Sequence, residues 1–390
     1  WNLAMRRIPG WPQTRLQLPA RKEVYLIPDA AFPDSFRRDL DALMAELVNP
    51  DPLSNAFFSR PVREVTAGIY RGQLRRFASE LVHSGVEMAE LQSVCILLEP
   101  QNAERGLRQM LKRTANKSTP LIRDIAALLR NLAKRTNRPV AVQDRLSELA
   151  KRVALPSQRG ITRKNRDRLR VLQSEENTLR LLTLPERLFA AAPPGKPHSF
   201  SEVCALEDAV AIGILLVCPV RIGNLATIHL DRHFQRPGDG RVYLVFVEDE
   251  TKNERPLEFE LPAQLVSMID RYLATRSPYR CPKGTPWLFS RRDGAGPVHS
   301  GQLAHRLSKR ILKATGFEMN AHLFRHFAVM NWLNANPGGY EVARRLLGHA
   351  ETSHTINMYS GLEITSATKA FADLIEAKRT AGRKTRGTRP

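Results

Sequence analysis

One stretch near the carboxyl end of the sequence constrains this chain more than any other. It contains His322-x-x-Arg325, a helix-like segment that ends in Leu347-Gly348-His349, and Tyr359. Residues three apart share one face of a helix, so His322 and Arg325 are expected on a common surface. No acidic residue lies among these candidate groups. The set therefore favours binding and transferring an anion, and a phosphodiester is the natural candidate.

A second arginine would have to be brought to this stretch by the fold. Arg221 follows an apolar segment, 202–217, which is expected to form a helix that ends before Pro219. An arginine matches two phosphate oxygens at once, so Arg221 and Arg325 would clamp both non-bridging oxygens of one phosphate. A tyrosine hydroxyl titrates at about pH 10 and becomes a useful nucleophile when cations stabilise its oxyanion. Tyr359 would gain that stabilisation from these two arginines.

Three further side chains complete the candidate chemistry. Segments 242–247 and 257–261 are rich in β-forming residues and predict a hairpin with Lys252 near its tip. There Lys252 would protonate the leaving 5′-hydroxyl as a general acid. His322 would take the proton of Tyr359 or hold the phosphate, and His349 would donate a hydrogen bond to the phosphate.

The motifs and their order resemble those of the tyrosine recombinases, also called phage-integrase-type site-specific recombinases. That family carries an arginine followed by Ile-x-x-Leu, then His-x-x-Arg, Leu-Gly-His and a nucleophilic tyrosine, and the resemblance covers roughly residues 179–374. The catalytic set that it implies is Arg221, Lys252, His322, Arg325, His349 and Tyr359. It also implies a covalent 3′-phosphotyrosine intermediate. Because that intermediate conserves the energy of the broken bond, no nucleotide cofactor and no metal is expected.

Two positions depart from the family pattern. Asn224 stands where the family usually has an acid that orients the active-site histidine and arginine residues, so this orientation is expected to be weaker. Tyr359 lies ten positions after His349, where nine are usual, and the added residue is expected in the loop before the tyrosine. Tyr340 and Lys283 are rivals for the nucleophile and the general acid. Tyr340 precedes His349, however, and no strand pair flanks Lys283 as the family's arrangement requires.

Each of these residues taken alone also has an ordinary structural interpretation, as a surface ion-pair partner or a satisfied core residue. Only their joint order favours catalysis. His322 and His326 are four apart, which suits a metal pair, but Leu323 stands where the zinc-protease motif has glutamate. No Gly-x-x-x-x-Gly-Lys loop for nucleotide phosphates occurs. Four scattered cysteines form no Cys-x-x-Cys pair and are typical of reduced core residues in a cytoplasmic protein.

The charge balance indicates the partner. The chain has 60 lysines and arginines against 39 acids, a formal net charge of +21 and a pI near 10.4. That excess is expected of a nucleic-acid binder, and no long apolar run suggests a membrane. Basic residues crowd the segments before the catalytic motifs, where they form either solvated helix faces or a surface for DNA phosphates. The candidate DNA-binding residues are Arg105, Arg108, Lys112, Arg113, Lys117, Arg159, Arg163, Lys164 and Arg166.

The pattern predicts a mainly α fold with a small antiparallel β-sheet. The expected parts are an N-terminal extension of unknown role (1–61), a helical core-binding domain (62–156), a basic interdomain linker (157–178), a mixed α/β catalytic domain (179–377) and a disordered basic tail (378–390). By the resemblance, the core-binding and catalytic domains form a clamp around DNA.

The resulting hypothesis is a site-specific recombinase or integrase of double-stranded DNA. Recombination of two duplexes implies a dimer on each site and a tetramer in the synaptic complex. The apolar positions of the last helix-like segment, 364–375, would dock either on a neighbouring copy or on their own domain. Two alternatives remain, a type IB topoisomerase-like relaxer and a catalytically inactive DNA-binding protein of the same fold.

Overall fold

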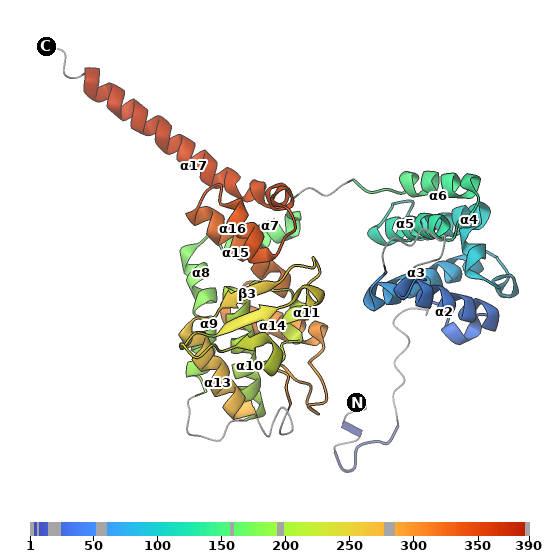
Figure 1. Ribbon diagram of the computed structural model, residues 1–390, viewed down its shortest axis with the longest axis horizontal. Coiled ribbons are helices and arrows are strands. Elements are labelled where there is room, and N and C mark those ends of the chain that lie inside the picture. Colours follow the sequence, from blue (N-terminus) through green and yellow to red (C-terminus); the bar gives the residue numbers. More distant parts are fainter. Residues whose placement is uncertain are drawn as a thin grey trace. The chain divides into compact units, whose positions relative to one another are not determined.

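Two compact units make up the chain, the first from Trp1 to Ser157 and the second from Gln158 to Pro390. The computed structural model describes residues 4–5, 8–14, 25–51, 61–156, 160–192, 199–276 and 285–386. Helices dominate both units, and the sheet lies in the second (Figure 1). The predicted class, mainly α with a small antiparallel sheet, is confirmed.

The first unit packs its helices around one apolar core. Its α-helices are α2 (Asp34–Val48), α3 (Glu64–His83), α4 (Pro100–Arg113), α5 (Pro120–Arg135) and α6 (Val140–Arg152), with 3-10 turns at Asp29–Ala31, Met88–Glu90 and Val94–Leu98. Phe36 and Leu40 of α2 are buried in the same cluster as Leu74 and Phe77 of α3. Helix α2 therefore belongs to this core, whereas the sequence predicted an N-terminal extension of unknown role up to residue 61.

The second unit is larger and contains every candidate catalytic residue. Its helices are α7 (Arg163–Val171), α8 (Glu175–Leu182), α9 (Leu184–Ala190), α10 (Phe200–Val217), α11 (Ile222–Ala226), α12 (Leu230–His233), α13 (Ala263–Arg276), α14 (Ser300–Thr315), α15 (Ala321–Ala335), α16 (Tyr340–Leu347) and α17 (Thr352–Arg386). Helix α10 lies at the centre of the core. It begins in a capping box formed by Ser199 and Glu202, and Pro219 follows its end.

A three-stranded antiparallel sheet holds the predicted hairpin. Its strands β1 (Phe234–Gln235), β2 (Tyr243–Phe246) and β3 (Leu257–Glu260) lie in that order. Strands β2 and β3 pair with Phe246 opposite Leu257. The alternating burial of β2 places Leu244 and Phe246 in the core. Lys252 lies in the turn that joins the two strands, as the sequence indicated.

The expected linker is largely part of the second unit. Helices α7 and α8 cover most of residues 163–178, and Leu169 and Leu172 are buried in the core of that unit. Leu169 on α7 and Leu172 directly after it face the core, while the basic side chains of the helix are on its other faces. Helix α17 also departs from expectation, because it continues to Arg386 where a disordered tail from residue 378 was expected. No helix in the described ranges has the length and apolar character needed to span a membrane.

Candidate functional site

Arg325 lies at the centre of the site and is almost fully buried. Asn320 caps the start of α15 by accepting the Leu323 amide at 2.9 Å. The Arg325 guanidinium donates to the carbonyl oxygen of Pro219 at 2.6 Å and to that of Leu347 at 2.8 Å. It therefore joins the chain that follows α10 to the end of α16, across a separation of about a hundred residues that the sequence alone left open.

Arg221 supplies a second guanidinium close to the first. It lies at the amino end of α11 and is half-buried. Burial lowers its pKa. Burial and the charge of Arg221 lower the pKa of Arg325 to about 10. Within the described residues, neither arginine has a carboxylate partner. Two partly desolvated cations without a counter-charge form a site suited to an anion, and one phosphate would relieve the repulsion of both.

Tyr359 lies on α17 near Arg325 and is 2% exposed. Its hydroxyl lies 3.0 Å from Nδ1 of His326, which is also buried. Burial raises the pKa of Tyr359 to about 12, against the opposing effect of Arg325. The sequence does not reveal His326 as a partner of the tyrosine. The spacing of four from His322 did place both on one face, but it suggested a metal pair.

His322 is an exposed neighbour of this contact. Its ring centroid lies 4.7 Å from that of His326, in an edge-to-face arrangement. Partial burial, followed by the charges of Arg325 and Arg221, lowers its pKa. In the structure His326, rather than His322, contacts the tyrosine hydroxyl. His322 thus lies within electrostatic reach of both arginines.

His349 follows the sharp turn that ends α16. Gly348 has a φ of 60°, and a Cβ added there would lie 2.7 Å from Leu257 Cδ2, so the turn favours glycine on both grounds. Nδ1 of His349 lies 2.9 Å from the hydroxyl of Thr355, a partner that the sequence did not reveal. The His349 and Tyr359 rings are nearly parallel, with centroids 6.4 Å apart. The side chain is thereby oriented next to the candidate nucleophile.

The β2–β3 turn brings Lys252 toward the same place. Lys252 is exposed, and its neighbour Asn253 accepts a hydrogen bond from Arg221 at 3.3 Å. Among the described residues, the Asn224 side chain makes no hydrogen bond to the histidines or arginines of the site. Its amide instead donates to the carbonyl oxygen of Glu250, at the base of the turn, at 3.0 Å. Asn224, which stands where the family pattern has an acid, therefore binds the β2–β3 turn.

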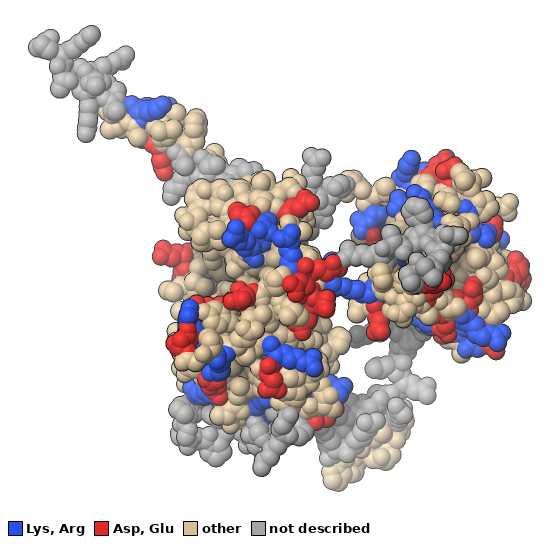
Figure 2. All heavy atoms as spheres, viewed as in Figure 1, with Lys and Arg blue, Asp and Glu red and all other residues tan. Residues whose placement is uncertain are grey.

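The candidate DNA-binding residues differ in their exposure and in whether they have partners within the protein. Arg163, Lys164 and Arg166 are exposed on α7, where Arg163 lies 3.9 Å from Asp167 and Arg166 donates to the Ile161 carbonyl at 3.4 Å. Arg159 lies outside the described residues. Figure 2 shows acidic and basic side chains interspersed over the face it displays, so net charge alone does not locate an interface.

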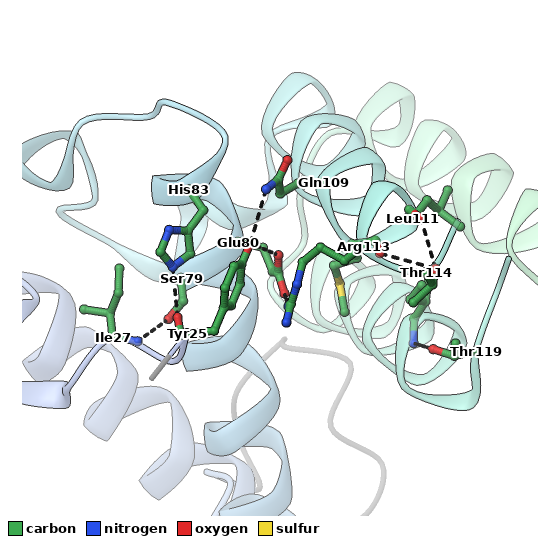
Figure 3. A network of polar contacts seen from close by, with 12 residues as sticks. Tyr25, Ile27, Ser79, Glu80, His83, Gln109, Leu111, Arg113, Thr114 and Thr119 are labelled. Atoms are coloured by element: carbon green, nitrogen blue, oxygen red, sulfur yellow. Dashed lines mark hydrogen bonds and ion pairs between the residues drawn. The ribbon is translucent and has the colours of Figure 1, made fainter. Parts of the chain in front are cut away.

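In the first unit, Lys112 and Lys117 are both exposed, but three arginines there have intramolecular partners. Arg105 donates to the Ser84 carbonyl, and Arg108 pairs with Glu104 at 2.6 Å. Arg113 pairs with the buried Glu80 at 2.5 Å and lies over the Tyr25 ring, whose hydroxyl also reaches Glu80 (Figure 3). Arg113 thus stabilises the fold of this unit and is not free to bind DNA.

A loss of stability in acid is expected from the buried histidines. Burial and nearby positive groups lower the pKa values of His326 and His349 to about 4, whereas an unfolded histidine titrates at about 6.5. The unfolded chain therefore binds more protons between these values, and the free energy of unfolding falls as the pH drops from about 6.5 to 4. We expect the Tm of wild type to fall more between pH 7 and pH 5 than the Tm of His326→Gln. Parallel melting profiles for the two proteins would contradict this account.

Comparison with known proteins gives three findings. Residues 186–364 match the model of the phage integrase family. No curated protein matches the sequence. Similar solved structures include XerA recombinase (15% identity, covering 86% of this chain and 98% of that chain, TM-score 0.37). The Tn1549 transposon integrase in complex with a circular intermediate DNA (15%, 86% and 99%, TM-score 0.48) and a lambda integrase dimer bound to a core site (14%, 81% and 85%, TM-score 0.39) are also similar.

Proposed function

Residues 186–364 form a domain of the phage integrase family, and from this premise we propose that the protein is a site-specific DNA recombinase that cuts and rejoins strands through a covalent tyrosine link. One observation carries the proposal. A buried tyrosine hydroxyl lies within electrostatic reach of Arg325, which in turn lies near Arg221, and neither guanidinium has a carboxylate partner among the described residues. Tyr359 is the nucleophile, and Arg221 and Arg325 bind the scissile phosphate.

The proposed reaction exchanges one phosphodiester for another. The Tyr359 oxygen attacks the phosphorus, and the bond from phosphorus to the 5′-oxygen breaks, which leaves a 3′-phosphotyrosine and a 5′-hydroxyl. Lys252 gives a proton to the departing 5′-oxygen. The arginines bind the non-bridging oxygens, whose charge is greatest in the transition state, and His349 donates to one of them. Attack by the 5′-hydroxyl of a partner duplex reverses these steps and rejoins the strands.

Proton transfer from Tyr359 depends on phosphate binding. The tyrosine pKa of about 12 and the His326 pKa of about 4 differ by about eight units. Transfer of the proton from the tyrosine to the histidine would therefore be strongly uphill in the protein without DNA. His326 thus acts as a hydrogen-bond acceptor that holds the hydroxyl in the arrangement observed. A bound phosphate would bring negative charge that raises the pKa of His326 and allows it to accept the proton.

The assembly follows from the same chemistry. Each copy contributes one Tyr359, so exchange between two duplexes requires four copies, and we expect a dimer on each DNA site and a tetramer in the synaptic complex. Phe371 and Leu374 of α17 are 63% and 50% exposed. Exposed apolar residues of this size support docking of the helix on a neighbouring copy.

Covalent capture tests the function. The protein is mixed with nicked duplexes whose cleavage releases a short strand, so that rejoining is prevented, and the products are run on denaturing gels beside native gel shifts. We expect an adduct that survives denaturation. Exchange of strands between two duplexes would then identify a recombinase, whereas relaxation of supercoiled DNA without exchange would identify a topoisomerase-like enzyme. A gel shift without any adduct would contradict the proposal for the protein alone.

DNA binding should lose part of its salt dependence when the exposed α7 cations are removed. Each phosphate contact contributes about 0.9 to the slope of log affinity against log salt. The double variant Arg163→Ala with Lys164→Ala should therefore lower the slope by about 1 to 2, as measured by fluorescence anisotropy at several salt concentrations. Arg236→Ala is the control, because Arg236 pairs with Asp270 at 2.8 Å, a much closer ion pair than the 3.9 Å between Arg163 and Asp167. Equal slopes in wild type and the double variant would exclude α7 from the interface.

A further inference from the structure

The turn that presents Lys252 is closed at its base. Thr251 is buried, and its hydroxyl accepts the Arg255 amide at 3.0 Å and lies 2.7 Å from the Arg255 carbonyl oxygen. Glu254 adopts a φ of 50°, which reverses the chain at the tip. Only Lys252, Asn253 and Glu254 lie between these closing residues. The position of Lys252 is thus set by how this short tip is fixed to the rest of the unit.

Asn253 makes the contacts that fix the tip. Its side-chain amide donates to the Gly348 carbonyl oxygen at 2.6 Å, and its Oδ1 accepts from Arg221 at 3.3 Å. The first contact joins the tip to the residue before His349. The Lys252 side chain itself is exposed and has no hydrogen bond or ion pair within the described ranges. The adjacent asparagine therefore determines where the lysine lies.

We propose that Asn253 is a positioning residue, which holds the Lys252 turn against Gly348 so that the lysine can protonate the leaving 5′-oxygen; this inference rests on the proposed function. The hydrogen bonds of Asn253 to Gly348 and Arg221 differ in length, and this difference indicates a different role for each. The short bond to Gly348 anchors the turn. The long bond to Arg221 is weak enough to be replaced by a phosphate oxygen when the guanidinium binds its substrate.

An amide suits this position better than its relatives. Asparagine offers a donor and an acceptor on one short side chain. Aspartate has the same size but cannot donate to the Gly348 carbonyl, and its charge would compete with phosphate for Arg221. Alanine removes both contacts and leaves the charges of the site unchanged. The two substitutions therefore separate loss of the anchor from a change in phosphate binding.

The test uses the leaving group as a chemical probe. Single-turnover cleavage is measured on two nicked duplexes, one with oxygen and one with sulfur at the 5′-bridging position. A thiol titrates at about 8.5 and leaves as thiolate without a proton, whereas an alcohol needs one. We expect Asn253→Ala to slow the oxygen substrate on the order of 10- to 100-fold, because small misplacements of a catalytic group have effects of that size. Its rate on the sulfur substrate should approach that of wild type.

Three reference variants accompany this measurement. Lys252→Ala should show the same selective rescue by sulfur with a larger loss on oxygen, about 100- to 10,000-fold. Asn253→Asp should be slow on both substrates, because it also hinders phosphate binding. Asn177→Ala is the matched control, since Asn177 on α8 likewise donates to a backbone carbonyl, that of Val171 at 2.9 Å, and should leave both rates unchanged. Melting curves and gel shifts establish that each variant folds and binds DNA.

The outcomes are distinguishable. Rescue of Asn253→Ala by sulfur supports the proposal. Equal losses on both substrates would overturn it, because the residue would then act through Arg221 or through the fold. Unchanged cleavage of the oxygen substrate by Asn253→Ala or Asn253→Asp would also overturn it. Absence of any adduct from wild type on either substrate would instead reject the proposed function.

Discussion

Tyr359→Phe is expected to bind its DNA as wild type does and to form no covalent adduct with it. The substitution removes the only atom that attacks phosphorus in the proposed reaction and keeps the ring that packs beside His326 and His349. Loss of the hydroxyl leaves Nδ1 of His326 without this partner. An unsatisfied buried polar group costs about 1 to 3 kcal/mol, so a small fall in Tm is expected. Denaturing gels measure the adduct, and native gel shifts measure binding.

Tyr340→Phe is the matched control for this result, because Tyr340 is the rival nucleophile in the same stretch. It should keep full adduct formation. An adduct formed by Tyr359→Phe and lost in Tyr340→Phe would overturn the assignment of the nucleophile. Loss in both variants would indicate that the aromatic hydroxyls act on the fold and would leave Tyr359 without a special role.

Arg325→Lys is expected to lower the cleavage rate by about 1,000-fold or more, the range for arginines that stabilise a transferred phosphoryl group. Lysine retains a positive charge but lacks the planar fork that reaches two oxygens. Arg325 already donates to the Pro219 and Leu347 carbonyls, so its geometry determines both the fold of the site and its binding of phosphate. DNA affinity should change little, because most phosphate contacts lie elsewhere.

The comparison for Arg325 is a second buried arginine. Arg276 is 6% exposed and donates to the carbonyl oxygens of Leu288 at 3.0 Å and Thr285 at 3.2 Å. Arg276→Lys should cause a similar loss of stability and leave the cleavage rate of the folded protein unchanged. If both substitutions slowed cleavage equally, Arg325 would be a structural residue and not a phosphate ligand. Single-turnover rates and melting curves of the two variants decide this.

The sequence predicts the order of the site residues along the chain and the hairpin that carries Lys252. It does not predict the contacts that join the hairpin to the other site residues. His322, Arg325 and Tyr359 stand in motifs with characteristic spacings, and β-rich segments flank Lys252. His326 and Asn253 were not recognised as functional, because each contact joins residues far apart in the chain. Asn253 reaches Gly348 across 95 positions, a contact that no local period of the sequence indicates.

Charge was the least informative guide to structure. The many basic residues of 157–178 suggested a linker, but two leucines, Leu169 and Leu172, seat α7 in the core. The basic end of the chain suggested disorder, yet α17 extends to Arg386. Ala, Lys and Arg are good helix formers, and Lys and Arg are also common in disordered segments. Composition alone therefore does not distinguish an exposed helix from a disordered tail. The sequence also does not show whether a basic residue such as Arg113 faces DNA or pairs within the protein. Its partner Glu80 lies 33 residues away in the chain, so the ion pair is visible only in the structure.

The most direct test of the central claim is to identify the residue that carries the DNA. The covalent adduct is formed on a nicked duplex, digested with nuclease and trypsin, and analysed by mass spectrometry. Cleavage after Arg345 and Lys369 gives a peptide in which Tyr359 is the only tyrosine, whereas Tyr340 falls in a different peptide. The account predicts a nucleotide on the Tyr359 peptide, joined through its 3′-phosphate. A nucleotide on any other peptide, or no adduct from wild type, would contradict it.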